Sequence, residues 1–384
     1  MENNEAFLIV TLSFLIFISP YVSKIVKMPT TATEIILGAV AGYFGILKDN
    51  DLFEIIAEVG FYYLMFLAGA EVDLRRLLNL DKTLLKRGIA YISLLYIFSL
   101  VICYYVGFSN IYIVIMPLIS IGLVLALYKE FGKGHKWLNL SMTIGTLGEF
   151  ISILALTFVG AVLEYGIGIN LYKSLGYLAL FLFGMYLIYS ILRTLFWWYP
   201  ELKVYLVPLD HDKEEKDIRL SMALFFLMIA IMLYLHLEIA FGAFIAGILI
   251  ATFFDHKAEL PHKLASFGFG FLVPIFFIYI GTTFDPKYIL EGGMIAKVVG
   301  LVVLMILIRF LSALVFLKIL TLREIVLFAL SHSMPLTLLI AVATLAYHSH
   351  SIDTFHYYMF VLASLVEVVV CMIAIKLLVP KRAS

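Results

Sequence analysis

The stretch IYIVIMPLISIGLVLALY (residues 111–128) decides the fold. It is long and apolar enough to cross a bilayer as one helix, yet Pro117 and Gly122 interrupt it on either side of Ser120. A membrane tolerates the backbone groups of a broken helix only where they are buried in protein or line a polar cavity. The stretch therefore predicts a discontinuous helix inside a bundle of other helices.

A second stretch, IVLFALSHSMPLTLLIA (residues 325–341), has the same character, because Pro335 follows three polar residues. These polar residues are Ser331, His332 and Ser333. An ordinary proline kink is the simpler explanation of either stretch alone. Two such stretches at matching places in two halves favour a pair of discontinuous helices that cross at the bilayer midplane, where freed backbone groups can bind an ion or offset a dipole.

The composition also places the chain in a membrane. Hydrophobic residues make up 63% and charged residues 14% of the 384 residues, and the mean hydropathy is +1.05. Soluble domains have about 45–50% apolar and about 25% charged residues. A net charge of zero without a basic patch excludes nucleic acid as a partner and leaves membrane lipid as the surrounding phase. Cys103 and Cys371 lie inside apolar runs and indicate neither a disulfide nor a metal site.

Charged loops divide the apolar sequence into segments of roughly 20 residues, the length that a helix needs to cross a hydrocarbon core about 30 Å thick. We predict an all-α polytopic membrane protein with 13 transmembrane helices. The predicted helices cover residues 6–26, 30–47, 52–72, 84–107, 110–128, 138–163, 169–196, 218–236, 238–254, 264–284, 293–317, 322–347 and 354–379.

The basic residues support this count and orient the chain, because Lys and Arg prefer cytoplasmic loops. Of the 27 Lys and Arg residues, 22 fall in one set of alternate gaps, 4 in the other set, and Arg309 lies inside a predicted helix. We therefore expect a multi-pass protein of the cell membrane with its N-terminus outside and its C-terminus in the cytoplasm. The first apolar run lacks a basic leader, so we expect a retained helix there.

The longest polar stretch, Glu201–Asp217, follows the seventh predicted helix and divides the chain into two groups of six helices. Because one helix separates the groups, they enter the membrane from opposite sides, as in inverted-repeat transporters. We expect a single transmembrane domain with a first inverted half at 1–163, a linker helix and cytoplasmic loop at 164–217, and a second inverted half at 218–384. We expect no cofactor and no C-terminal regulatory domain.

Three ionisable residues lie near the middle of predicted helices, where each costs about 2.5–3.5 kcal/mol on insertion scales. They are Glu149 in TIGTLGEFISILAL (143–156), Arg309 in LMILIRFLSAL (304–314) and Glu367 in VLASLVEVVVC (361–371). One arginine cannot pair separately with two acids, so we expect Glu149 to be functional and the other two to form a structural, charge-balancing pair. Glu34 lies nearer a helix end, and we expect it to reach the membrane interface.

Oxygen-bearing side chains surround Glu149 in the sequence. Thr146 and Ser152 lie three residues to either side, and Gly145 lies one turn earlier. Together with Ser120 they predict a site for a proton or a hard cation such as Na⁺, with Glu149 as the metal ligand. The alternative for each hydroxyl is a hydrogen bond to the preceding turn of its own helix.

The predicted outer loop YHSHSIDTFH (347–356) places His348, His350, Asp353 and His356 close together. A zinc or pH-sensing site is one interpretation of this loop. A solvated loop without a special purpose is the simpler one, and we prefer it.

Three motifs resemble the monovalent cation:proton antiporter superfamily, in the branch of the NapA-type sodium/proton antiporters and the Kef-type potassium efflux proteins. FYYLMFLAGAEVDLRRL (61–77) is similar to that branch's third-helix signature. AFGAFIAGILIA (240–251) is similar to its small-residue helix, and FLVPIFFIYIGTTFD (271–285) to its Phe-Phe stretch followed by Gly. The acidic and basic helices also fall where the family keeps its carboxylate and its Lys or Arg.

The resemblance implies roles for individual residues. Glu149 matches the second acid of the family's paired-acid motif, which carries the ion and the proton, and Arg309 matches its basic residue. Gly148 departs from the pattern, because sodium antiporters of this branch usually have Asp there and Kef-type proteins Gln. The family also implies a homodimer, and an elevator-like motion of a core domain against a scaffold.

We therefore expect a secondary active Na⁺(Li⁺)/H⁺ antiporter with a role in pH homeostasis, in which one buried carboxylate binds a cation and a proton in competition. Because Gly148 removes the second acid and arginine stays protonated, we expect electroneutral exchange of one cation for one proton. The alternative is a K⁺/H⁺ antiporter or a Kef-like K⁺ efflux protein. The sequence contains no HExxH, GxSxG or GxGD motif, so we expect a transporter and not an enzyme.

Overall fold

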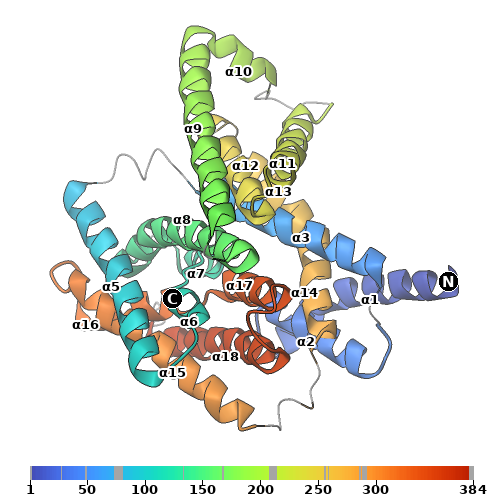
Figure 1. The fold of residues 1–384 in the computed structure, drawn as a ribbon, viewed down its shortest axis with the longest axis vertical. Coiled ribbons are helices and arrows are strands. Elements are labelled where there is room, and N and C mark those ends of the chain that lie inside the picture. The colour runs from blue at the N-terminus through green and yellow to red at the C-terminus, as the bar shows by residue number, and fades with distance from the viewer. Residues whose placement is uncertain are drawn as a thin grey trace. The chain divides into compact units, whose positions relative to one another are not determined.

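The computed structural model describes residues 2–26, 28–47, 50–72, 81–132, 134–166, 168–206, 214–254, 257, 259–284, 287 and 292–379. Within these ranges the fold consists of helices and connections, without a strand, which confirms the predicted all-α class (Figure 1). The end of the third-helix motif at 73–77, residue 285 of the Phe-Phe motif and residues 207–213 of the polar linker lie outside the described residues.

The chain divides into two compact units, which we call unit 1 and unit 2. Unit 1 comprises Met1–Arg75 and Tyr165–Pro286, and unit 2 comprises Arg76–Glu164 and Lys287–Ser384. Each unit therefore combines a segment from the first part of the chain with a segment from the second part.

Unit 1 contains mostly continuous helices. They are α1 (Glu2–Val26), α2 (Thr30–Tyr43), α3 (Asp51–Ala70), α9 (Ile169–Trp198), α10 (Pro200–Leu206), α11 (Lys216–Leu235), α12 (Ile239–Phe253), α13 (Leu260–Phe267), the π-helix η1 (Gly268–Leu272) and α14 (Val273–Thr282). The Asn50 side chain accepts a hydrogen bond from the backbone N–H of Leu52, which caps the start of α3.

Glycines bring the backbones of unit 1 into direct contact. In the crossing of α2 with α14, a Cβ on Gly38 would collide with the Ile278 carbonyl, and one on Gly281 would collide with the Ile35 carbonyl. In the crossing of α3 with α12, Gly247 likewise lies directly against the α3 backbone. Small residues allow such close approach, which drives helix association where lipid offers no hydrophobic gain.

Unit 2 contains the two interrupted stretches. Its helices are α5 (Lys82–Val106), α6 (Ile111–Ile115), α7 (Gly122–Phe131), α8 (Lys136–Tyr165), α15 (Met294–Ala313), the 3₁₀ helix η3 (Leu314–Phe316), α16 (Leu322–His332), α17 (Leu336–His348) and α18 (Thr354–Leu378). A capping box formed by Thr321 and Glu324 starts α16. The α16 and α17 axes are bent by 41° at the break before Leu336.

Helix contacts repeat between the two predicted halves. In unit 1, α2 packs on α14 and α3 on α12, which are equivalent pairs if α2 corresponds to α12 and α3 to α14. In unit 2, α5 packs on α6 and α15 on α16, and the two broken stretches contact each other through α6 with α17 and α7 with α16. An internal repeat would produce such a pattern, and the division into two inverted halves stays a prediction.

The count of 13 spans remains a prediction. Each predicted segment coincides with a helix or with a run of consecutive helices. Among the described residues, however, nine helices are long and apolar enough to cross a membrane, or ten if the bent pair of α16 and α17 is one span. The helices α2 and α12, with 14 and 15 residues, are shorter than the predicted segments and account for part of the difference.

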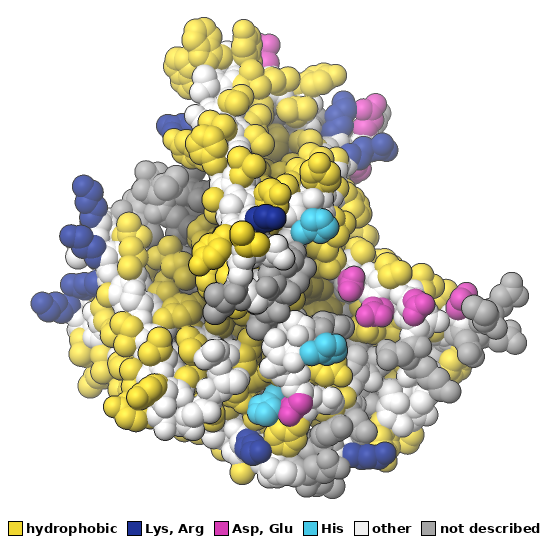
Figure 2. Space-filling view, in the orientation of Figure 1, with side chains coloured by type: hydrophobic (Ala, Val, Ile, Leu, Met, Phe, Trp, Pro, Cys, Tyr) yellow, Lys and Arg dark blue, Asp and Glu magenta, His cyan; other side chains and the backbone are white. Residues whose placement is uncertain are grey.

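Many apolar side chains point outward, as lipid contact requires. Ile25, Tyr104 and Leu377 are each at least 80% exposed. Figure 2 shows hydrophobic side chains over large parts of the displayed face. Exposed apolar surface of this extent is incompatible with a water-soluble protein of this size and fits a multi-span membrane protein.

Candidate functional site

The first break holds the predicted central carboxylate. Helix α6 ends at Ile115 and α7 begins at Gly122, so the intervening backbone is free to reach toward α8. The Ser120 hydroxyl donates a hydrogen bond of 3.0 Å to Oε1 of Glu149 on α8. Both side chains are buried, with exposed fractions of 4% and 1%.

The second break contributes a hydroxyl to the same place. Oγ1 of Thr337, in the first turn of α17, lies 3.1 Å from Oγ of Ser120. Because Ser120 donates its single hydrogen to Glu149, Thr337 donates to Ser120. Sequence reasoning missed Thr337, although it is the first hydroxyl after Pro335 and so the natural candidate on the second half-helix.

The other two predicted hydroxyls have structural contacts. Oγ of Ser152 accepts a hydrogen bond of 3.1 Å from the backbone N–H of Ile119, a residue of the first break. The Thr146 hydroxyl donates to the Met142 carbonyl at 2.7 Å, the bond to the preceding turn that was the alternative interpretation. Ser152 therefore holds the broken stretch against α8, and the Thr146 hydrogen is used within its own helix.

Arg309 holds the first break from the other side. Its Nη2 donates a hydrogen bond of 2.7 Å to the Leu118 carbonyl, and its Nη1 donates to the Met305 carbonyl at 3.0 Å. Nη1 also lies 3.4 Å from Oε1 of Glu367, so the pairing expected from the sequence is present between two fully buried side chains. Within the described residues, Nε of Arg309 and Oε2 of Glu367 have no hydrogen-bond partner, so the pair is incompletely satisfied.

Gly148 explains how the first break approaches α8 so closely. A Cβ at this position would come within 2.5 Å of Cδ1 of Ile119. Ile119 therefore occupies the space that a side chain at position 148 would need. An Asp at this position would require Ile119 to move.

Two expectations about other polar residues change with the structure. Glu34 is buried within the protein and does not extend from its surface: its side chain is 3% exposed, and Ser19 lies 3.2 Å from its Oε1. In the predicted outer loop, Asp353 caps α18 and contacts His356 at 2.7 Å. Within the described residues no group of three or more His, Cys, Asp or Glu side chains could hold a metal ion, so the zinc interpretation gains no support there.

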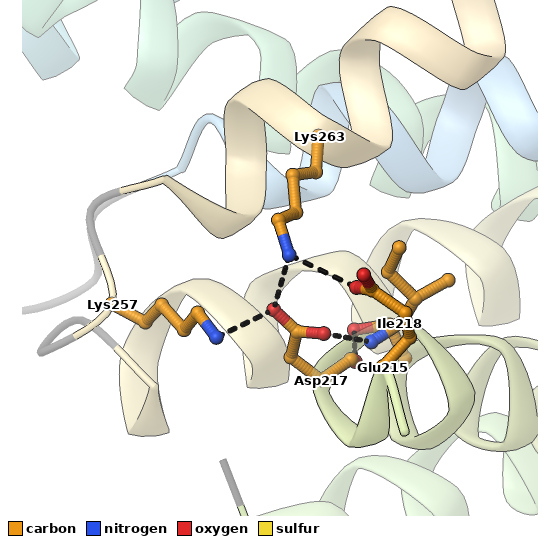
Figure 3. Close-up of polar contacts among 6 residues, drawn as sticks. Glu215, Asp217, Ile218, Lys257 and Lys263 are labelled. Atoms are coloured by element: carbon orange, nitrogen blue, oxygen red, sulfur yellow. Dashed lines mark hydrogen bonds and ion pairs between the residues drawn. The ribbon is translucent and has the colours of Figure 1, made fainter. Parts of the chain in front are cut away.

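Unit 1 has a charged cluster that sequence reasoning missed (Figure 3). Asp217 in the first turn of α11 is fully buried and contacts Nζ of Lys257 at 3.0 Å and Nζ of Lys263 at 3.4 Å. Lys263 also pairs with Glu215 at 3.0 Å. The acid near the helix N-terminus and the two lysines from the segment after α12 join α11 to the start of α13. The sequence places these residues in two gaps of the set that carries most of the basic residues, but it gives no sign of the contacts between them.

Comparisons with known proteins fit these observations. The profile of a family described as "Sodium/hydrogen exchanger, transmembrane" matches residues 12–381. A putative Na(+)/H(+) antiporter YjbQ of Bacillus subtilis (strain 168) is 24% identical over an alignment of 381 residues that covers 92% of this chain, and the chain spans 60% of that relative's length. The probable Na(+)/H(+) antiporter 3 of Methanocaldococcus jannaschii is 25% identical over 315 residues, covering 80% of this chain and 78% of the relative.

One further relative and one solved structure also resemble this chain. The ammonium/H(+) antiporter subunit AmhT of Alkalihalophilus pseudofirmus is 28% identical over 278 residues, covering 70% of this chain and 68% of that protein. The solved structure of the sodium proton antiporter MjNhaP1 from M. jannaschii at pH 8 covers 98% of each chain with a TM-score of 0.67. Its sequence identity of 16% makes that likeness evidence for the fold alone.

Proposed function

We propose, because the chain belongs to the sodium/hydrogen exchanger family, that it exchanges Na⁺ or Li⁺ for protons across the cell membrane at Glu149. The observation that carries this proposal is the buried Glu149 carboxylate between two broken helices, with the hydroxyls of Ser120 and Thr337 in line with it. A carboxylate and hydroxyl oxygens are the ligands that a hard monovalent cation takes. A buried carboxylate also cannot stay charged without a counterion or a proton.

The hydrogen-bonded chain from Thr337 through Ser120 to Glu149 suits a carboxylate that binds a cation and a proton in turn. When Glu149 is ionised, Thr337 donates to Ser120 and Ser120 donates to the carboxylate. When Glu149 is protonated, its own hydroxyl can donate to Ser120 and the chain reverses. Ser120 and Thr337 then offer lone pairs in either state, so the site needs no large rearrangement when a proton replaces a cation.

Arg309 supplies a fixed charge and not an exchanging one. Its guanidinium is permanently protonated and is held by the Leu118 carbonyl and by Glu367. Ile119 fills the place of a second acid beside Glu149. We therefore favour electroneutral exchange of one cation for one proton, with Glu149 as the single exchanging carboxylate.

The division into units supports an elevator mechanism. Ser120, Glu149, Thr337, Arg309 and Glu367 all belong to unit 2. A motion that carries unit 2 as one body would move the whole site between the two sides without breaking its contacts. We propose that unit 1 is the scaffold of a homodimer in the lipid bilayer, with the N-terminus outside and the C-terminus in the cytoplasm.

Transport assays in proteoliposomes test the proposed function. The purified protein is reconstituted with an imposed pH gradient, and Na⁺, Li⁺, K⁺ or NH₄⁺ is added while an internal dye reports the pH. We expect Na⁺ and Li⁺ to collapse the gradient, and we expect Glu149→Gln to abolish this collapse. Collapse by K⁺ alone would establish the K⁺/H⁺ alternative. Collapse by NH₄⁺ alone would show that this chain exchanges ammonium for protons, the activity that the name of the AmhT relative gives for that protein.

A matched control separates loss of the site from loss of any buried acid. Glu34→Gln also removes a buried carboxylate from a membrane helix, but this carboxylate lies in unit 1 beside Ser19. We expect Glu34→Gln to exchange Na⁺ for protons at the wild-type rate. If Glu149→Gln also retains wild-type exchange, the assignment of the site is wrong.

A further inference from the structure

The second break has its own polar contacts, centred on His332. This residue ends α16 and is fully buried. Its Nε2 lies 3.0 Å from the Ser141 carbonyl on α8, and its Nδ1 lies 3.1 Å from the Tyr91 hydroxyl on α5. The ring also packs edge-on against Phe328, with the ring centroids 4.4 Å apart. Neither the Ser141 nor the Tyr91 contact follows from a sequence motif.

These two contacts determine the tautomer of His332. A backbone carbonyl can only accept a hydrogen bond, so Nε2 carries the hydrogen that the Ser141 carbonyl receives. The Tyr91 hydroxyl then donates to Nδ1. Because full burial disfavours a charged ring, we take the imidazole as neutral, and both of its nitrogens then have a hydrogen-bond partner. The central charged side chains of the helices that contact α16 are Glu149 of α8, and Arg309 of α15 and Glu367 of α18, which pair with each other.

A second bond ties the same two helices. The Ser331 hydroxyl lies 2.8 Å from the Ser141 hydroxyl. One turn further along α8, a Cβ on Gly145 would come within 3.2 Å of Nε2 of His332 and within 2.8 Å of Cγ2 of Ile121. The absent side chain of Gly145 therefore leaves room for both broken stretches at the same turn of α8.

One face of α8 thus meets both breaks. Ser141, Gly145 and Glu149 follow one another at intervals of four residues, which places them on one side of the helix. The first two contact the end of α16, and the third contacts Ser120, which Thr337 holds from the start of α17. His332 and Thr337 stand on opposite sides of the break at Pro335.

We infer that His332 is a positioning residue that fixes the break between α16 and α17 on α8, and so sets the geometry of Thr337, Ser120 and Glu149 for the cation. It acts as a neutral donor to Ser141 and exchanges no proton with the transported ion. The inference rests on the proposed function of Glu149. It adds a residue that determines cation affinity at the same site.

A matched pair of substitutions tests the role of each ring nitrogen. His332→Gln places an amide N–H near the position of Nε2 and keeps the bond to Ser141, whereas His332→Asn can accept from Tyr91 but cannot reach Ser141. We expect His332→Gln to keep the half-saturating Na⁺ concentration within about threefold of wild type. We expect His332→Asn to raise it roughly tenfold, the effect of losing one buried hydrogen bond, at a similar maximal rate. Equal affinities in wild type and both variants would overturn the inference.

Two further readouts do not depend on transport. Imidazole ¹⁵N NMR of the folded protein, with the His332 signal assigned from its absence in His332→Gln, should show a protonated Nε2 and a bare Nδ1 from pH 6 to pH 9. An imidazolium signal in that range would overturn the neutral assignment. The pH profile of exchange in His332→Gln should match that of the wild type, and a lost limb would show that His332 takes part in proton exchange.

The outcomes also separate this inference from the proposed function. If the wild-type protein moves no protons in response to any of the four cations, the proposed function fails. Direct Na⁺ binding to the purified protein then decides the inference, with tighter binding expected for His332→Gln than for His332→Asn. If the wild type exchanges Na⁺ and the two variants bind it equally well, the inference fails and the proposed function stands.

Discussion

Unit 1 and unit 2 solve the problem of packing helices in lipid in different ways. In unit 1, glycines on α2, α3, α12 and α14 place backbone directly against backbone, and the crossings have little room for adjustment. In unit 2, two helices are interrupted: Ser152 and Arg309 hold backbone groups of the first break, and His332 joins the second break to α8. Tight apolar packing suits a scaffold, and the polar contacts are concentrated around Glu149, the carboxylate that we propose binds the ion.

The charged clusters of the two units also differ, in how far they are buried and in whether their hydrogen bonds are satisfied. Asp217 of unit 1 meets two lysines, of which Lys263 is one-third exposed, so water can share the cost of burying the charges. Arg309 and Glu367 of unit 2 are both fully buried and incompletely satisfied among the described residues. A buried pair of this kind adds little stability but makes the loss of one partner costly.

The largest effect is expected in the packing of unit 1. Gly247→Ala would drive a methyl group into the Phe66 carbonyl and the Ala70 N–H, which belong to a helix backbone and cannot turn aside. We expect destabilisation by roughly 4 kcal/mol or more, and a melting temperature in detergent lowered by at least about 10 °C. Gly176→Ala on α9, where no atom lies within 4 Å of the added Cβ, is the control and should melt like the wild type. Equal melting of the two variants would show that the glycine crossing does not determine the stability of unit 1.

The next effect is expected from Glu367→Gln, which leaves the Arg309 charge buried without its acid. We expect a loss of about 3–5 kcal/mol, measured by thermal unfolding in detergent, with exchange retained by the folded fraction. The double reversal Arg309→Glu with Glu367→Arg should recover only part of this loss, because Glu cannot donate to the Leu118 carbonyl. A double reversal less stable than both Arg309→Glu alone and Glu367→Arg alone would rule out the pairing as the source of the effect.

A third prediction concerns position 148, where unit 2 has a glycine and so lacks a second acid beside Glu149. Gly148→Asp alone should destabilise the protein by about 1–3 kcal/mol, because Ile119 occupies the space. Gly148→Asp together with Ile119→Ala makes room for a second carboxylate beside Glu149. With a K⁺ potential clamped by valinomycin, we expect the rate of the double variant to depend on voltage, and the rates of the wild type and of Ile119→Ala to be independent of it. A voltage-dependent wild type would exclude electroneutral exchange.

The smallest effect is expected from Asp217→Asn. This change keeps the side-chain shape but removes the charge that Lys257 and Lys263 contact. We expect a loss of about 1 kcal/mol with a normal rate of exchange. The buried Lys257 loses its acid, but Lys263 is partly exposed, keeps Glu215 and is screened by water. A loss as large as that of Glu367→Gln would show that the two clusters cost the same to disrupt, and would remove this contrast between the units.

Local chemistry allowed part of this structure to be predicted. The breaks occur where Pro117, Gly122 and Pro335 stand in otherwise apolar helices, because proline removes a donor and clashes with the preceding turn. The contact of Arg309 with Glu367 was predictable because Gly148 leaves no acid beside Glu149 and Glu367 is the other central carboxylate.

The remaining contacts depend on which helix faces meet, and one sequence does not give that. Thr337 and Tyr91 look like ordinary residues of an apolar helix until the two breaks are brought together. Thr146 was expected beside the cation because of its spacing from Glu149, but its hydrogen bonds to its own helix. The helices α2 and α12 came out shorter than the apolar runs that contain them, since hydropathy does not show where the backbone turns away from the helix axis.

The central claim is that one carboxylate, Glu149, binds the cation and the proton in competition. Proton release from the purified protein measures this directly: Na⁺ is added in weakly buffered solution, a pH dye counts released protons, and Na⁺ binding is measured in parallel. The account predicts at most one proton released per Na⁺ bound in the wild type and none in Glu149→Gln. Undiminished release in Glu149→Gln, or two protons per Na⁺ in the wild type, would contradict it.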